Sequence, residues 1–361
     1  MVFNLSLCAI IIFIYFITHI SKNKKLSDKV FLLSSFFILF LVVALRKTNI
    51  GNDTTEYINI FKNCSIYKWN YLNSNSRYET GYLIFNIILS YFSSNTRFFL
   101  IIMSFIFNFS VYKIIKENSK NYLFSILIYI NLLFFYQSMT MMRQFLALSV
   151  LLLSFNYIKE KKLLKYSLAV LLASSFHITA VLGIFIYPMY NMKFSYKKIF
   201  LYTIITLIVA TLLNKIFPYL ALITNRGEFY SQMIGEAKLA NIILFLIYLV
   251  FSFFSYFIVS KKNIESNSFY LYSFIFSTLL YALSINTAIL ARVGQYFAIF
   301  SIISLPNVIY YNIKKSRLVF DSIIILLLVL YSSIIMVCRP EWNSAYNYES
   351  CIGNWNESGC N

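Results

Sequence analysis

The sequence places five polar residues inside long apolar stretches, where such side chains are unusual. They are Arg143 and Gln144 in MTMMRQFLALS, His177 in LLASSFHITAVL, and Arg292 and Tyr296 in TAILARVGQYFAIF. A charge at membrane depth is costly unless it is paired or lines a wet cavity, and a guanidinium group suits bidentate binding of phosphate or carboxylate. If Arg143, His177 and Arg292 converge, they could clamp a dianionic group in a cleft of low dielectric constant. The alternatives are an Arg143 that reaches the outer headgroups and a His177 with a purely structural role.

Carboxylates gather in the most polar long stretch, residues 46–79. Thr54 or Asp53 could cap a short helix that begins near Thr55. Asp53 and Glu56 are three residues apart and share a helical face if the helix begins at the cap. Glu79 follows at the entry to the next apolar segment. These carboxylates could bind a sugar, act as a general base, or simply pair with the arginines of the same stretch. Those arginines are Arg46 and Arg77.

The composition indicates what kind of protein must position these residues. Hydrophobic residues make up 60% of the 361 residues and charged residues only 12%, with a mean hydropathy of +0.70. Soluble domains have nearly half apolar and about a quarter charged residues. With only 8 Gly and 4 Pro, disordered and collagen-like classes are excluded as well. The chain is therefore predicted to be an all-α polytopic integral membrane protein.

The net charge of +18 would fit a nucleic-acid-binding protein, but the placement of the charges favours a membrane topology. Most lysines lie in six short clusters between apolar runs, the pattern of loops held on the cytoplasmic side. No nucleic-acid partner is therefore expected. The clusters are 22–29, 113–120, 159–165, 193–198, 261–262 and 314–317.

The apolar runs between these clusters predict about twelve transmembrane helices with both termini outside. Several runs are shorter than the roughly 20 residues of a straight crossing, so some helices are expected to be short or re-entrant. Residues 80–93 are interpreted as re-entrant or interfacial, and the first run as a retained helix rather than a cleaved signal peptide. The runs are 4–20, 30–45, 98–115, 122–137, 144–158, 166–176, 178–190, 199–216, 242–260, 269–286, 292–312 and 318–337.

This topology makes residues 1–361 a single transmembrane domain with three outer segments: a first loop at 46–79, a second at 214–241 and a C-terminal tail at 338–361. The inner clusters contain 18 of the 23 lysines but only one of the 8 arginines. Lysine serves as a topology signal, whereas arginine presents a planar fork of donors for anions. The outward arginines therefore suggest an anionic ligand at the outer leaflet, unless composition alone explains them.

Four of the five cysteines fall on the predicted outer side, Cys64, Cys338, Cys351 and Cys360. An oxidising compartment allows one or two disulfides among them. Either a Cys351–Cys360 bridge or a link from Cys64 to the tail is plausible.

Several motifs that carry chemistry in other proteins are missing. The sequence has no P-loop, no GxGxxG, no Cys/His metal spacing and no Asp-rich metal motif. We therefore expect no metal and no cofactor. The energy for any reaction must come from the substrate itself, for example from a leaving diphosphate.

The motifs in their order and spacing resemble the EpsG-like family, which comprises exopolysaccharide and O-antigen polymerases of the Wzy type. The resemblance extends over roughly residues 40–300. The residues that carry it are Arg46, the Gly-Asn-Asp turn with Glu56-Tyr57, Glu79-Thr80-Gly81-Tyr82, Arg143-Gln144 with Ala147, Ala173 to His177, and Arg292 with Tyr296-Phe297. The family pattern usually has a longer acidic turn, and Trp342 and Tyr346 match its tail motif only loosely.

The resemblance implies a metal-independent glycosyltransferase of GT-C type in the bacterial inner membrane, with its active site facing the periplasm. It would join undecaprenyl-diphosphate-linked oligosaccharides and release the diphosphate lipid; membrane lipid and a chain-length regulator protein are further expected partners. By the resemblance, Arg143 and Arg292 hold the diphosphate, and His177 activates the acceptor hydroxyl or contacts the diphosphate. Asp53 and Glu56 are alternative bases. The remaining candidate substrate-binding residues are Arg46, Glu79, Gln144 and Tyr296.

Two other functions remain open. A flippase for lipid-linked sugars would be expected to show matched internal repeats, which the sequence lacks. An O-antigen ligase usually has a much larger outer loop than residues 214–241.

Overall fold

The computed structural model describes residues 1–74, 77–191, 239–262, 268–285, 288–313, 316–339 and 348–352, with isolated residues between 193 and 208. Within these ranges the secondary structure is helical, apart from an isolated β-bridge between Arg46 and Ser350. The all-α prediction is therefore confirmed for the described part of the chain. The chain divides into two compact units, one formed by Met1–Val181 with Ser316–Asn361 and the other by Leu182–Lys315.

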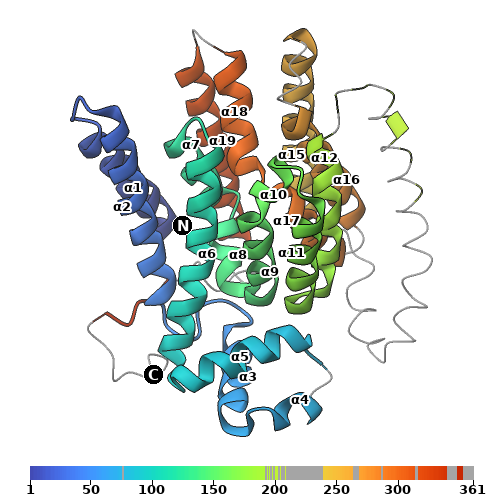
Figure 1. The fold of residues 1–361 in the computed structure, drawn as a ribbon. Coiled ribbons are helices and arrows are strands. Elements are labelled where there is room, and N and C mark those ends of the chain that lie inside the picture. The colour runs from blue at the N-terminus through green and yellow to red at the C-terminus, as the bar shows by residue number, and fades with distance from the viewer. Residues whose placement is uncertain are drawn as a thin grey trace. The chain divides into compact units, whose positions relative to one another are not determined.

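The first unit is built on a row of packed helices in which α2 packs on α6, α6 on α9 and α9 on α11, while α1 and α19 pack on α7 (Figure 1). A 3₁₀ helix, η1 (Ile178–Phe185), begins directly after His177. The helices of this unit are α1 (Val2–Thr18), α2 (Lys24–Ala44), α3 (Thr54–Tyr67), α4 (Asn70–Ser74), α5 (Thr80–Phe92), α6 (Thr96–Asn118), α7 (Tyr122–Asn131), α8 (Phe134–Thr140), α9 (Met142–Leu153), α10 (Phe155–Lys159), α11 (Leu163–Phe176) and α19 (Arg317–Cys338).

The second unit is centred on α16, which packs against α15, α17 and α18. The hydroxyl of Tyr248 on α15 donates to the carbonyl of Ala298 at the end of α17, at 3.1 Å. The described helices of this unit are α12 (Ile186–Asn191), α15 (Leu239–Lys262), α16 (Ser268–Ser284), α17 (Ala288–Ala298) and α18 (Ser301–Asn312). Most of the run predicted at 199–216, and the loop predicted at 214–241 up to residue 238, lie outside the described residues.

Four described helices are long and apolar enough to cross a membrane, and two bent pairs raise this number to six if each pair counts as one span. Five shorter apolar helices accompany them. The protein is thus a polytopic membrane protein, while the count of about twelve crossings stays a prediction. The four long helices are α2, α6, α15 (over Leu239–Phe257) and α19, and the bent pairs are α7 with α8 and α17 with α18.

Asparagine residues define the starts of three helices in the first unit. The side chain of Asn23 accepts from the backbone N–H of Leu26, that of Asn95 from Arg97 and that of Asn121 from Phe124. The first backbone N–H groups of a helix have no partner within the helix, and such a side chain satisfies one of them. These asparagines therefore define where the three helices begin, whereas the hydropathy profile alone gives only an approximate start.

A buried polar network holds the break between α7 and α8. The amide of Asn4 donates to Asn131 Oδ1 at 3.2 Å and to Ser332 Oγ at 3.1 Å, and the hydroxyl of Tyr136 donates to Asn4 Oδ1 at 3.0 Å. Leu133 at the break has a left-handed backbone, with φ of 67°. Because polar groups in an apolar environment are costly unless paired, this network ties α1, α7, α8 and α19 together and fixes the direction of α8.

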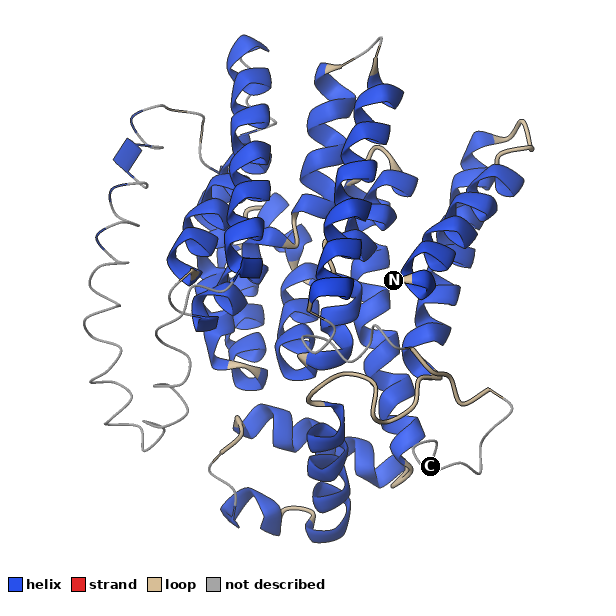
Figure 2. Ribbon diagram, turned by 180° about the vertical axis from the view of Figure 1, so that it is seen from behind, coloured by secondary structure: helices blue, strands red, loops and turns tan. Residues whose placement is uncertain are grey.

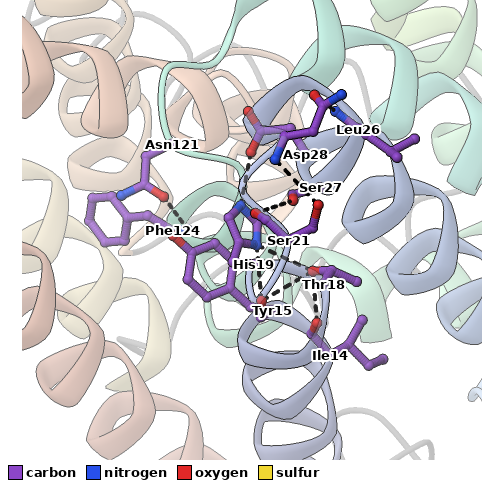
Figure 3. Close-up of polar contacts among 11 residues, drawn as sticks. Ile14, Tyr15, Thr18, His19, Ser21, Leu26, Ser27, Asp28, Asn121 and Phe124 are labelled. Atoms are coloured by element: carbon purple, nitrogen blue, oxygen red, sulfur yellow. Dashed lines mark hydrogen bonds and ion pairs between the residues drawn. The ribbon is translucent and has the colours of Figure 1, made fainter.

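The turn between α1 and α2 is held by His19 (Figure 3). Its Nε2 lies 3.1 Å from Asp28 Oδ1, its Nδ1 lies 2.9 Å from the carbonyl of Tyr15, and its ring stacks on the Tyr15 ring at 4.0 Å. These contacts close the hairpin of α1 and α2 and give His19 a structural role.

The short helices α3, α4 and α5 lie together beyond one end of the long helices of the first unit, and α5 runs across the direction of α6 (Figures 1 and 2). The lysine-rich turns α1–α2 and α6–α7 lie at the opposite end (Figure 1). Lys159, at the end of α10, donates to Asn118 at the end of α6 at 3.0 Å. The first unit thus separates its basic turns from the 46–79 segment, as the charge pattern predicts.

Candidate functional site

The predicted site residues of the first unit meet at Glu79, the residue that precedes α5. One carboxylate oxygen, Oε2, pairs with the guanidinium of Arg143 at the start of α9. The other, Oε1, lies 3.3 Å from His177 Nδ1, within ion-pair distance but without hydrogen-bond geometry. It also accepts from the backbone N–H of Ile178 at 3.3 Å, a favourable place for a negative charge because that group opens η1. Three segments far apart in the sequence therefore converge on one carboxylate.

The charged cluster of Glu79, Arg143 and His177 is largely shielded from solvent, with side chains only 14–20% exposed. Burial alone would raise the pKa of Glu79, but the contacts with His177 and Arg143 outweigh it and lower this pKa to about 2. Glu79 is therefore ionised at every physiological pH. An ionised carboxylate beside His177 Nδ1 favours a proton on that nitrogen and leaves Nε2 as an acceptor.

A glycine allows the cluster to form. A Cβ atom on Gly81 would lie 2.2 Å from Ser175 Oγ, 2.6 Å from Ser175 Cβ and 2.7 Å from the Ser175 carbonyl oxygen. The first turn of α5 therefore contacts the last turn of α11 almost backbone to backbone. Since Glu79 precedes this turn and His177 follows α11, the close approach at Gly81 sets their distance.

Two tyrosines extend the cluster toward α3. The Arg143 guanidinium carbon lies 5.0 Å from the centre of the Tyr78 ring and 5.9 Å from that of Tyr57, within cation–π range. The Tyr78 hydroxyl donates to Glu56 Oε1, and Arg77 Nη2 lies 3.3 Å from the same oxygen. Burial, and next the hydrogen bond to Glu56, raise the pKa of Tyr78. Tyr78 thus connects the Glu79 cluster to Glu56, and the predicted alternative of a Glu56–Arg77 ion pair is confirmed.

The start of α3 lies within one residue of the predicted position near Thr55, but the predicted cap is not formed by Asp53. The helix begins at Thr54 with Asp53 as the preceding residue, although the Asp53 side chain makes no capping hydrogen bond. Gly51 has a φ of +93°, and a Cβ on it would lie 2.5 Å from the carbonyl oxygen of Met139. The hydroxyl of Thr54 donates to the same carbonyl at 3.0 Å. The Gly-Asn-Asp turn therefore packs on the end of α8, directly before Arg143.

Arg46 lies apart from the cluster and is fully buried. It donates to the carbonyl of Val43 at 2.6 Å, of Ile50 at 3.3 Å and of Met139 at 3.5 Å. Arg97 donates to the carbonyls of Ala44 at 2.9 Å and of Arg46 at 2.6 Å. Both guanidinium groups lie at the C-terminal end of α2, where backbone carbonyls lack helical partners.

The C-terminal segment completes this arrangement. Cys351 is disulfide-bonded; its backbone N–H donates to the carbonyl of Leu45 at 2.8 Å, and its sulfur accepts from Arg97 at 3.0 Å. Cys360 lies outside the described residues. Cys64 is a free, buried thiol, so the alternative that links Cys64 to the tail is wrong; α3 buries this residue on its inner face against α5.

Three predicted residues remain, Gln144 in the first unit and Arg292 and Tyr296 in the second. Gln144 is buried next to Arg143 on α9. Arg292 and Tyr296 lie one turn apart on α17 in the second unit, with Tyr296 fully buried. The described residues contain no group of three His, Cys, Asp or Glu side chains that could hold a metal ion.

An open groove of about 570 Å³ lies along the exposed face of α3. Among the residues that line it are Asn52, Glu56, Asn59 and Asn63. Of this lining, the sequence pointed to Glu56 but not to the asparagines. Glu56, Asn59 and Asn63 follow one another at three or four residues along one face of α3, and this spacing is a signal that could have revealed the groove.

These features define a class of protein: a polytopic α-helical membrane protein with a shielded carboxylate–arginine–histidine cluster beside short helices at one end. The model of the EpsG family matches residues 29–350. The chain belongs to the EpsG family, which indicates a polysaccharide-polymerase type of role with glycosyltransferase-like activity. No curated protein and no solved structure matches the chain.

Proposed function

We propose that this protein is a polysaccharide polymerase that joins undecaprenyl-diphosphate-linked repeat units of an O-antigen or exopolysaccharide. The observation that carries the proposal is the convergence of His177, Glu79 and Arg143 on one shielded site. The proposed setting is the bacterial inner membrane, with about twelve crossings in a GT-C-like arrangement and the site facing the periplasm. The four long apolar helices, the two bent pairs and the separation of basic turns from α3–α5 support this setting.

The proposed role of His177 is to activate the acceptor. The carboxylate of Glu79, 3.3 Å from Nδ1, orients the imidazole so that Nε2 can accept a proton, as an orienting carboxylate does for a histidine base. The acceptor hydroxyl oxygen attacks the anomeric carbon of the donor sugar while the bond from that carbon to the diphosphate oxygen breaks. The hydroxyl proton passes to His177, and the diphosphate lipid leaves with the electron pair.

The proposed role of Arg143 is to stabilise the leaving diphosphate. Its Nε is buried and has no hydrogen-bond partner, although Glu79 already pairs with the other end of the guanidinium. A buried donor without a partner is costly, and a phosphate oxygen would satisfy it. Gln144, next to Arg143 on α9, is proposed to contact the same diphosphate. Arg292 and Tyr296 on α17 keep their predicted substrate-binding role as a proposal.

The chemistry follows from the substrate. Because the leaving diphosphate supplies the driving force, the proposed reaction needs no metal or cofactor. A substrate-binding role for Arg46 remains a proposal. Its hydrogen bonds to three backbone carbonyls support a structural role in the loop that follows α2.

The test is a surface-polysaccharide gel of a deletion strain complemented with wild type, Arg143→Ala, His177→Ala or Arg292→Ala. We expect the wild type to restore the ladder and the variants to leave a single repeat unit, with the same amount of protein in the membrane. A deletion that removes every repeat unit would favour a flippase or a ligase instead. A full ladder from all three variants would refute the proposed site.

A further inference from the structure

The groove along α3 differs in chemistry from the Glu79 cluster beside it. Its lining includes the amides of Asn52, Asn59 and Asn63 and the rings of Tyr71 and Tyr78. The two charges that line it, on Glu56 and Arg77, neutralise each other at 3.3 Å. The groove therefore has no net charge to attract a phosphate, but its lining offers several hydrogen-bonding side chains together with two tyrosines.

This lining suits a neutral sugar. Each amide presents a carbonyl acceptor and an NH₂ donor, which match the hydroxyl groups of a pyranose, and tyrosine rings supply flat apolar surfaces with a polar edge. Asn59 lies one helical turn from both Glu56 and Asn63 on α3, so the polar groups follow one another along the groove. The volume of about 570 Å³ lies within the range of about 300–1,000 Å³ that is common for ligand sites.

Part of the groove is held in place before any ligand binds. The Tyr78 hydroxyl and Arg77 both bind Glu56 Oε1, and the Asn63 amide donates to the Tyr71 hydroxyl at 3.4 Å. The inner face of α3 is anchored by the buried side chains of Tyr57 and Phe61. A surface ordered in this way loses less conformational entropy on binding than a flexible loop.

Tyr78 joins the groove to the charged cluster. Its hydroxyl binds Glu56 in the groove, while its ring faces Arg143 at 5.0 Å. A sugar held against Tyr78 would therefore lie beside the residues proposed to receive its proton and to hold the diphosphate. Both substrates are linked to a lipid diphosphate, but only the donor reacts at the sugar bonded to it. The acceptor reacts at its non-reducing end, so the neutral groove suits the acceptor.

We propose that the α3 groove binds the neutral non-reducing-end sugars of the acceptor glycan and directs its hydroxyl toward His177. This inference rests on the proposed function and adds to it a specific site for the acceptor, formed by Asn59, Asn63 and Glu56 on α3 with Tyr71 and Tyr78. The site suits the acceptor because the reacting end of the acceptor carries no phosphate, whereas the donor reacts at the sugar bonded to its diphosphate.

The test measures binding separately from catalysis. The probe is the repeat-unit oligosaccharide of the same strain, released from its lipid by mild acid, and titrated against purified full-length protein in nanodiscs. We expect Asn59→Ala to raise the Kd about tenfold, the effect of losing one or two hydrogen bonds. The matched control is Asn70→Ala, an exposed asparagine on α4 that does not line the groove, and it should bind like the wild type.

Two further variants keep the outcomes distinct. Arg143→Ala should still bind the lipid-free glycan while losing polymer, and Asn59→Ala should shorten the ladder rather than abolish it. Wild-type affinity in Asn59→Ala, an equal loss in Asn70→Ala, or no binding by the wild type would each overturn the groove proposal. If the glycan binds as expected but the deletion strain keeps its full ladder, the proposed polymerase function fails while the glycan site stands.

Discussion

The contact between Gly81 and Ser175 gives the sharpest prediction. Replacing Gly81 with alanine puts a Cβ atom 2.2 Å from Ser175 Oγ and 2.7 Å from the Ser175 carbonyl oxygen, whereas real Cβ contacts stay above 3.0 Å. The hydroxyl can rotate away, but the backbone carbonyl and the Ser175 Cβ at 2.6 Å can move only with α11. We therefore expect α5 and α11 to separate locally by several tenths of an ångström, which moves Glu79 away from His177.

The size of the effect follows from the geometry. Misplacing a catalytic group by about 1 Å can reduce a rate by roughly 100-fold, and overpacking costs about 1–3 kcal/mol of stability. We expect Gly81→Ala to reduce polymer synthesis by about 10- to 100-fold and to lower the melting temperature. The assay is the polysaccharide ladder of the complemented deletion strain, normalised to the protein in the membrane, with thermal unfolding of the purified protein beside it.

A second helical glycine supplies the control. A Cβ on Gly294 of α17 would meet no atom closer than Leu280 Cβ at 3.5 Å, an ordinary van der Waals distance. Gly294→Ala should keep full activity and gain stability, because alanine favours a helix over glycine by about 0.5–1 kcal/mol. Adding Ser175→Gly to Gly81→Ala should restore part of the activity. Wild-type polymer from Gly81→Ala alone would refute the reasoning.

Three more predictions concern charge, the tail and topology. Glu79→Gln should destabilise the protein by about 2 kcal/mol, because Arg143 loses a charged partner. Folding lowers the pKa of Glu79 from its ordinary 4.5 to about 2. The stabilisation by the Glu79 carboxylate is therefore complete above pH 5 and is lost only as the pH falls toward 2. Thermal unfolding of wild type and variant from pH 3 to 8 checks this prediction, and equal melting temperatures would contradict it. Arg97→Ala should lower the free energy of unfolding by about 3 kcal/mol and release the C-terminal segment, because two carbonyls at the end of α2 and the sulfur of Cys351 lose their donor. Limited proteolysis with mass spectrometry measures the release of this segment. Unchanged proteolysis of the segment would contradict the prediction. Exposed Cys338 should react with a membrane-impermeant maleimide on intact cells, whereas buried Cys64 should react only after denaturation; labelling of Cys338 only in broken cells would reverse the proposed topology.

Local patterns in the sequence predicted the elements well. The helix that follows Asp53, the separate helix at Thr80–Phe92 and the break at His177 all occur close to where hydropathy and turn residues place them. The lysine clusters predicted which turns of the first unit share an end. Helix starts and breaks depend on residues within about one turn of helix. The side of each turn follows from the alternation of inner and outer loops along the chain. A single sequence contains both patterns.

Some roles could not be assigned from the sequence because they depend on contacts between distant segments. Arg46 and Glu79 both appear as candidate ligands in the sequence, yet Arg46 is buried among carbonyls while Glu79 binds Arg143. The difference arises from how the loop after α2 folds onto α8 and Arg97. No local pattern at either residue contains that information.

The sequence by itself determined the class of protein, the positions of most described helices and the residue types available for anion and sugar chemistry, because these follow from composition, periodicity and capping. Only the tertiary structure decided that Glu79 is the meeting point of Arg143 and His177. It also decided that a neutral groove on α3 lies next to them through Tyr78. The physical reason is the approach of α5 to α11 at Gly81, a contact between segments distant in the chain that exists only once the helices have packed.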